Sequence, residues 1–97
     1  MINGVFYKGA DLAVELETDI QLTGGTVSIL VKLADGTMEE YTGEIVRFST
    51  IAATIPAEDN TQAGEIFLQA KAVIAGKTSI GTTESAIIFD NFVVPGP

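Results

Sequence analysis

Hydrophobic and polar residues alternate along much of this chain, most clearly from Thr26 to Ala34. In that run valine, isoleucine and leucine occupy every second position, and Ser28 and Lys32 fall between them. A period of two is typical of a β-strand with one face in a core. The β-branched residues favour the same structure, because they pack well on a pleated surface. The sequence therefore predicts a central strand here, which follows a turn at Thr23-Gly24.

The same alternation predicts further strands on both sides of this run. We expect them at residues 5–7, 11–17, 37–48, 49–55 and 65–75, with one or two more within 78–94. Asp35-Gly36 between two such runs indicates a hairpin, since glycine accepts a positive φ. Gly43 interrupts the run 37–48 and predicts a bulge or bend. The polar stretch 57–64 suits a single helical turn capped by Asp59 or Asn60.

Seven or eight short strands separated by turn signals predict an all-β fold. An antiparallel β-sandwich is the expected architecture, and a small, partly open β-barrel is the alternative. The chain of 97 residues is expected to form a single domain over residues 1–94. Residues 95–97 are expected to be a C-terminal tail, because their two prolines cannot join a sheet ladder.

The chain is acidic, with 13 acidic residues against five basic ones and a net charge of −8. Nucleic-acid binding needs clustered lysine and arginine, so nucleic acid is not an expected partner. No apolar run reaches the roughly 20 residues of a membrane helix, so no membrane contact is expected either. The first residues lack the pattern of a secretory signal, which predicts synthesis in a cytoplasm.

Cysteine, histidine and tryptophan are all missing from the sequence. Without cysteine the chain has no disulfide, thiol nucleophile or thiolate metal site. Without histidine it lacks the commonest general base and the commonest zinc ligand. We therefore expect no enzymatic activity, no catalytic residue, no metal and no cofactor.

Three short patterns could still carry chemistry, and each has a simpler explanation. Gly76-Lys77-Thr78 resembles the end of a phosphate-binding loop, but the earlier glycine of that motif is missing, and a hairpin turn is favoured. Asp35-Gly36-Thr37 has the wrong order for an aspartic protease and is explained as a hairpin. Glu15, Glu17 and Asp19 share one strand face and could supply oxygen ligands to calcium, although a solvated outer face is favoured.

Apolar residues on the outer side of strands mark the expected contact surface. Phe67 and Val73 lie on the opposite side of the second long strand from its regularly spaced aliphatic residues. A contiguous apolar patch of this kind would mark a partner surface. The C-terminal segment Phe92-Val93-Val94 could add a strand to a neighbouring chain. Two further aromatic residues that could lie outside the core are Tyr7 and Tyr41.

Two segments together resemble a known family. The first contains Phe6, Gly9-Ala10-Asp11 and residues 21–29, QLTGGTVSI; the second is residues 59–70, DNTQAGEIFLQA. This order of motifs resembles the N-terminal domain of phage baseplate upper proteins and related tail modules. Compared with the family, Ala10 is an inserted residue, and Ile66 stands where an aromatic residue is common.

The resemblance implies an immunoglobulin-like β-sandwich that acts by protein–protein contact. With no fibre region after Pro97, it implies a free-standing structural module at the baseplate, neck or head surface of a phage or prophage particle. The expected location is the virion, with synthesis in the bacterial host cytoplasm. The expected partners are other phage structural proteins and copies of the chain itself, arranged in a homo-oligomeric ring. The alternative is an adhesin-like surface module that binds carbohydrate or calcium.

Overall fold

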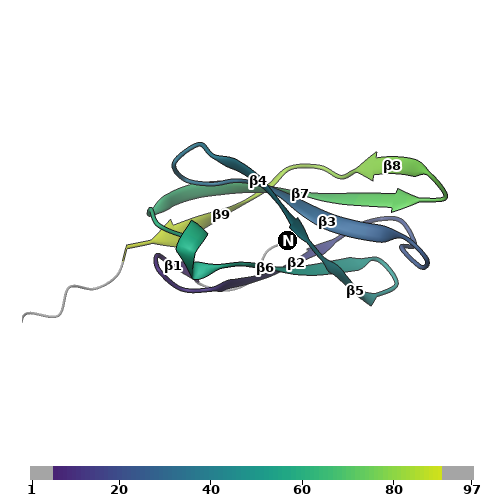
Figure 1. Ribbon diagram of the computed structural model, residues 1–97, viewed down its shortest axis with the longest axis horizontal. Helices are drawn as coiled ribbons and strands as arrows, with labels where there is room; N and C mark the ends of the chain where they lie inside the picture. Colours follow the sequence, from purple (N-terminus) through teal and green to yellow (C-terminus); the bar gives the residue numbers. More distant parts are fainter. Residues whose placement is uncertain (1–5, 91–97) are drawn as a thin grey trace, which may run out of the picture.

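The computed structural model describes residues 6–90 and contains two β-sheets that pack against each other (Figure 1). The strands within those residues are β1 (Phe6–Tyr7), β2 (Leu12–Glu17), β3 (Thr26–Lys32), β4 (Met38–Thr42), β5 (Glu44–Arg47), β6 (Thr50–Ile55), β7 (Gly64–Ile74), β8 (Lys77–Ile80) and β9 (Glu84–Phe89). One 3₁₀ turn, η1 (Ala57–Asp59), precedes β7. The fold is all-β, as predicted, and its two layers are those of a β-sandwich.

The larger sheet has the strand order β1-β9-β7-β3-β4, and β8 pairs with the far end of β7. The smaller sheet has the order β2-β6-β5. The β1–β9 pair is parallel, and the other pairings are antiparallel. The prediction of a purely antiparallel sandwich therefore missed one pairing, in which the first described strand joins the last.

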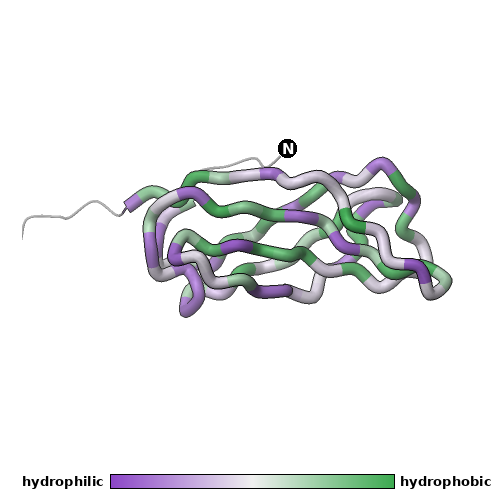
Figure 2. The backbone as a smooth tube through the Cα atoms, turned by 90° about the horizontal axis from the view of Figure 1, so that it is seen from above, coloured by the Kyte–Doolittle hydropathy of each residue, from purple (hydrophilic) through white to green (hydrophobic). Residues whose placement is uncertain are grey.

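The core lies between the two sheets and is made of aliphatic side chains. Hydrophobic residues recur along the strands (Figure 2), and every second position of β2, β3 and β7 holds one, as a period of two requires. The buried apolar residues are Leu12, Val14, Leu16, Leu22, Val27, Ile29, Val31, Leu33, Ile51, Ile55, Ile66, Leu68, Ala70, Ala72 and Ile88. The predicted strands that form β2, β3 and β7 thus turn their regularly spaced aliphatic residues inward, whereas every residue of β5 and β8 is exposed.

The strand predicted to be central, β3, lies between β7 and β4 in the larger sheet. The hairpin predicted after it is also present. Gly36 has φ +89°, and its N–H donates to the Leu33 carbonyl at 2.9 Å. The Thr37 N–H donates to a carboxylate oxygen of Asp35 at 2.9 Å, which holds the pKa of Asp35 below its ordinary value. Ala75 and Gly76 form the β7–β8 hairpin, so a turn explains the phosphate-loop fragment.

Gly43 is the bend that the sequence predicted, and the bend carries the chain from one sheet to the other. β4 belongs to the larger sheet and β5 to the smaller, and Gly43 is the single residue between them (Figure 1). A Cβ atom at this position would lie 2.6 Å from Cγ2 of Ile51 and 3.1 Å from the carbonyl oxygen of Ala52. Glycine is required because the chain passes so close to β6. The run 37–48 is therefore two strands, which contributes to a count above the predicted seven or eight.

The polar stretch 57–64 contains the expected helical turn, but the predicted cap is wrong. The N-cap residue is Pro56, and the first N–H of the turn, that of Ala57, donates instead to a carboxylate oxygen of Asp11 at 2.7 Å. Asn60 instead ends the turn and is 3% exposed. Its Nδ2 donates to the carbonyl oxygens of Tyr7 at 2.8 Å and Ala10 at 2.9 Å. Asn60 therefore ties the β6–β7 connection to the segment between β1 and β2.

Candidate functional site

The outer face of the larger sheet carries a row of exposed or half-buried apolar side chains, which we call the outer stripe. It consists of Tyr7, Leu30, Met38, Phe67, Ile87 and Phe89. Each of these residues neighbours an inward-facing one along its strand, so the pleat directs it away from the core. The larger sheet is thus apolar on both faces where these strands meet.

Strand register makes the stripe continuous around Phe67. On one side Phe67 pairs with Ser85, which places Ile87 as its diagonal neighbour on β9. On the other side it pairs with Lys32, which places Leu30 as its diagonal neighbour on β3. Diagonal neighbours in a sheet lie about 7–8 Å apart, which long and aromatic side chains can bridge.

The two ends of the stripe follow from the same register. Phe89 lies two residues after Ile87 on the same face of β9, and its ring centroid is 6.1 Å from that of Tyr7. At the other end Met38 pairs with Lys32 across β3 and β4 and is 75% exposed. The stripe therefore crosses the sheet from β1 to β4.

A groove of 670 Å³ lies beside Phe67 on this face. Its apolar lining is Leu30, Val31, Met38 and Phe67. Its polar lining is Lys32, Glu39, Glu40, Gln69 and Thr83. Apolar side chains with a few polar groups at the margin are the usual composition of a protein contact site.

A polar network across three strands borders the stripe. Ser28 is 8% exposed, and its hydroxyl donates to a carboxylate oxygen of Glu40 at 2.7 Å. The Lys71 ammonium lies 3.3 Å from the same carboxylate. The hydrogen bond from Ser28 and the charge of Lys71 hold the pKa of Glu40 below its ordinary value of 4.5. The buried serine is thus engaged in linking β3 to β4.

Of the residues predicted to form a contact surface, some lie in the outer stripe and others do not. Phe67 is 38% exposed and lies at the centre of the outer stripe. Val73 shares the outer side of β7, but Gln69 and Lys71 separate it from Phe67, so it lies outside the stripe. The predicted segment Phe92-Val93-Val94 lies outside the described residues. Of the two tyrosines, Tyr7 lies in the stripe.

Tyr41 turns toward the core, where its hydroxyl donates to a carboxylate oxygen of Asp59 at 2.8 Å. Burial raises the pKa of Tyr41, and the bond to Asp59 adds to the shift. Leu30, Met38, Ile87 and Phe89 also lie in the stripe, although the sequence did not predict them there. Their alternation within each strand was a usable signal, but their proximity depends on the pairing of distant strands.

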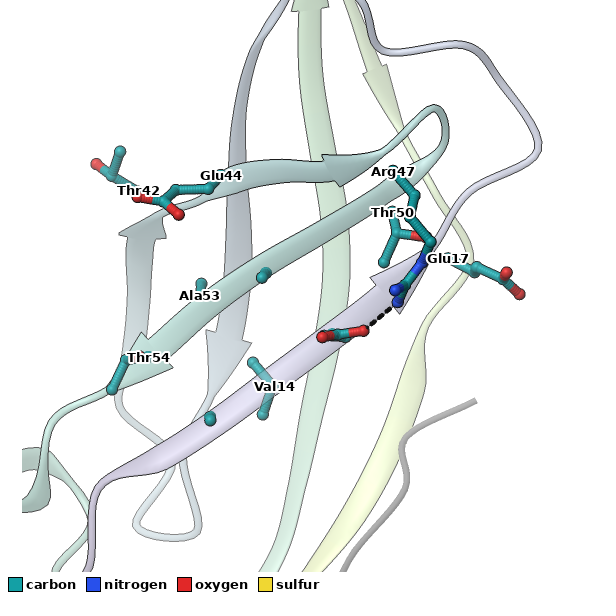
Figure 3. A pocket seen from close by; sticks show the side chains of 11 residues that line it. Val14, Glu17, Thr42, Glu44, Arg47, Thr50, Ala53 and Thr54 are labelled. Carbon is teal, nitrogen blue, oxygen red and sulfur yellow. Dashed lines mark hydrogen bonds and ion pairs between the residues drawn. The ribbon is translucent and has the colours of Figure 1, made fainter.

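Glu15 and Glu17, two of the three predicted calcium ligands, line a separate depression of 760 Å³ on the smaller sheet (Figure 3). Glu15 forms an exposed ion pair with Arg47. Figure 3 shows the Glu17 side chain pointing away from that pair. Glu44 lies on the far strand of this sheet, opposite Ala52. Asp19, the third residue of the predicted calcium site, is exposed beyond the end of β2. Within residues 6–90 these carboxylates do not form a group arranged to hold a metal ion, as calcium requires.

Residues 6–90 contain neither a metal-binding cluster nor a membrane-spanning helix. Among these residues, no group of three or more acidic, histidine or cysteine side chains is arranged to hold a metal ion. Over the same residues, no helix has the length and apolarity needed to cross a bilayer.

Comparison of the chain with protein-family models, with curated proteins and with solved structures gives no match. The resemblance to phage baseplate modules therefore rests on the turn motifs of the sequence alone.

Proposed function

We propose that this chain is a non-enzymatic structural module of a phage or prophage particle, and that it acts by protein–protein contact through the outer stripe. The observation that carries the contact role is the apolar outer face of the larger sheet. A contiguous apolar patch of this kind typically marks a contact surface. The particle itself is suggested by the order of turn motifs in residues 6–29 and 59–70.

The strand edges support contact through a face. Unpaired edges invite association with other sheets, and charged side chains discourage it. The smaller sheet has Glu15 on its edge strand β2, with Glu44 and Arg47 on its edge strand β5. The larger sheet has Glu39 and Glu40 on its edge strand β4.

The engaged polar groups support a structural role. Ser28 and Asn60 are the kinds of buried polar residue that can carry chemistry, and both are held in hydrogen bonds that join strands or loops. Serine needs an adjacent base to become a nucleophile, and Ser28 faces a carboxylate whose lowered pKa makes it a poor base.

The particle assignment is tested by quantitative mass spectrometry of purified virions from a host that carries the gene. We expect the chain in a fixed ratio to the other structural proteins of the particle. Its presence in the lysate but absence from washed virions would contradict the assignment.

The role of the stripe is tested by incorporation of two variants into those virions. Phe67→Glu places a charge at the centre of the stripe, and Phe48→Glu places one on a residue that is 76% exposed in the β5–β6 turn. We expect the first variant to be lost from particles and the second to be retained. Equal incorporation of both folded variants would refute the role of the stripe.

A further inference from the structure

We infer that the outer stripe docks a second copy of this chain, so that the larger sheets of two molecules face each other across a two-fold axis. This inference rests on the proposed function, in which the stripe is a protein contact. It adds the identity of the partner and the symmetry of the pair.

The distribution of charge favours a second copy. The charged side chains that the pleat directs to the outer face of the larger sheet are Lys32, Lys71, Glu40 and Glu65, and their charges sum to zero. Glu39, on the edge strand β4, also lines the groove. The other 11 acidic and three basic residues (13 − 2 and 5 − 2) lie elsewhere and hold the entire net charge of −8. Two identical acidic molecules repel each other through most of their surface. They can approach closely only through a face without net charge, and the outer stripe lies on such a face.

The area of the stripe fits an interface of standard size. Three half-exposed aromatic side chains, of about 200 Å² each, leave about 250 Å² accessible. The aliphatic residues of the stripe bring the total to on the order of 400 Å², at about 100 Å² for a fully exposed aliphatic side chain. A standard interface buries about 800 Å² per partner, of which about 450 Å² is non-polar.

The shape of this face, with a groove and a protruding side chain, suits a self-complementary contact. The stripe combines a groove of 670 Å³ with a protruding residue, Met38, which is 75% exposed. In a two-fold pair every contact between two different features occurs twice, so the knob of each copy can fill the groove of the other. Methionine is unbranched and adapts to such grooves.

Lys32 provides the sharpest test, because it pairs with Phe67 on one side and Met38 on the other. Lys32→Glu changes the charge of the face from 0 to −2 in each copy. Lys77→Glu makes the same change in net charge at the β7–β8 turn, opposite Ile74 and away from the stripe. The two variants therefore differ in where the new charge lies.

The experiment is sedimentation velocity of the full chain over a hundredfold range of concentration, for the wild type and both variants. We expect the wild type to form a dimer. We expect Lys32→Glu to weaken the dimer by at least about a hundredfold, because like charges are brought together in the contact. Lys77→Glu should weaken it by less than about threefold, since exposed charges outside the contact are screened. Met38→Glu is a second stripe variant, and unfolding curves confirm that each variant is folded.

Two outcomes would overturn the inference. One is a wild type that stays monomeric at about 1 mM, where even a weak pair is populated. The other is a dimer that both lysine variants weaken equally. If the wild type is monomeric but Phe67→Glu is still lost from virions, only the identity of the partner is wrong. If Phe67→Glu is also incorporated normally, the proposed role of the stripe fails as well.

Discussion

Replacement of Asn60 with alanine is the most informative perturbation of the fold. This side chain is 3% exposed and donates two hydrogen bonds, at 2.8 and 2.9 Å, to the carbonyl oxygens of Tyr7 and Ala10. The backbone carbonyl of Asn60 accepts from the Gly9 N–H at 2.9 Å, a bond that the alanine variant keeps. The side-chain bonds hold the segment that carries Tyr7 and therefore one end of the outer stripe.

The cost of Asn60→Ala follows from those bonds. Each neutral hydrogen bond contributes about 1 kcal/mol, and a carbonyl left without its donor adds a further part of its desolvation cost. We expect a loss of about 2–3 kcal/mol in the free energy of unfolding, which is a large share of the roughly 5–15 kcal/mol typical of a domain. For a chain of this size that loss lowers Tm by about 10–20 °C.

The assay is thermal and urea unfolding followed by circular dichroism, with Gln62→Ala as the control. Gln62 is exposed in the same connection, so its variant should stay within about 0.5 kcal/mol of the wild type. Asn60→Asp should cost more at pH 7 than at pH 4, because a carboxylate would then face two carbonyl oxygens. If Asn60→Ala unfolds within about 0.5 kcal/mol of the wild type, the two hydrogen bonds do not hold the β1–β2 segment.

Three further predictions concern the bend, the two faces of the larger sheet and acid stability. Gly43→Ala should lower the free energy of unfolding by about 1–3 kcal/mol, because the added methyl overlaps β6. At Gly81 the atom nearest to an added Cβ is 3.7 Å away, so Gly81→Ala should stay within about 0.5 kcal/mol of the wild type. Equal urea midpoints for the two variants would refute the close approach. Ile29→Ala removes a fully buried side chain and should lower the free energy of unfolding by about 2–5 kcal/mol. Ile87 is 49% exposed, so Ile87→Ala should lower it by less than about 1 kcal/mol. The reverse order in calorimetry would show that the two faces are misassigned. Glu40→Gln should lower the free energy of unfolding above pH 4.5, the ordinary pKa of Glu40. The difference from the wild type should disappear as the pH falls through the lowered pKa of the folded state. A difference that does not depend on pH would show that the carboxylate charge is not involved.

The strands and their buried faces could be predicted from the sequence because they depend on local alternation. Val27, Ile29 and Val31 fall on one side of a strand whatever its neighbours are, and all three are buried. Gly43 was predicted to be a bend for the same kind of local reason. That the bend transfers the chain to the second sheet could not be predicted, because the transfer depends on packing against β6.

The candidate contact surface was predictable only in part. Alternation alone places Phe67 outside the core, but Leu30 and Ile87 become its neighbours through pairing with β3 and β9. Those pairings join segments far apart in the sequence, and a shift of one residue would send each side chain to the other face. The same local logic selected Val73, which is on the outer side of β7 but is separated from the stripe by polar neighbours. The phage particle itself stays a prediction from the turn motifs.

The most direct test of the outer stripe as a contact surface is the reactivity of a single introduced thiol. The chain has no cysteine, and Met38 and Phe48 are 75% and 76% exposed, so Met38→Cys and Phe48→Cys report from the stripe and from outside it with matched initial exposure. The account predicts that, on assembly at high concentration or in particles, the modification rate falls at least about tenfold for Met38→Cys and stays unchanged for Phe48→Cys. Equal rates for the two thiols in every state of assembly would contradict it.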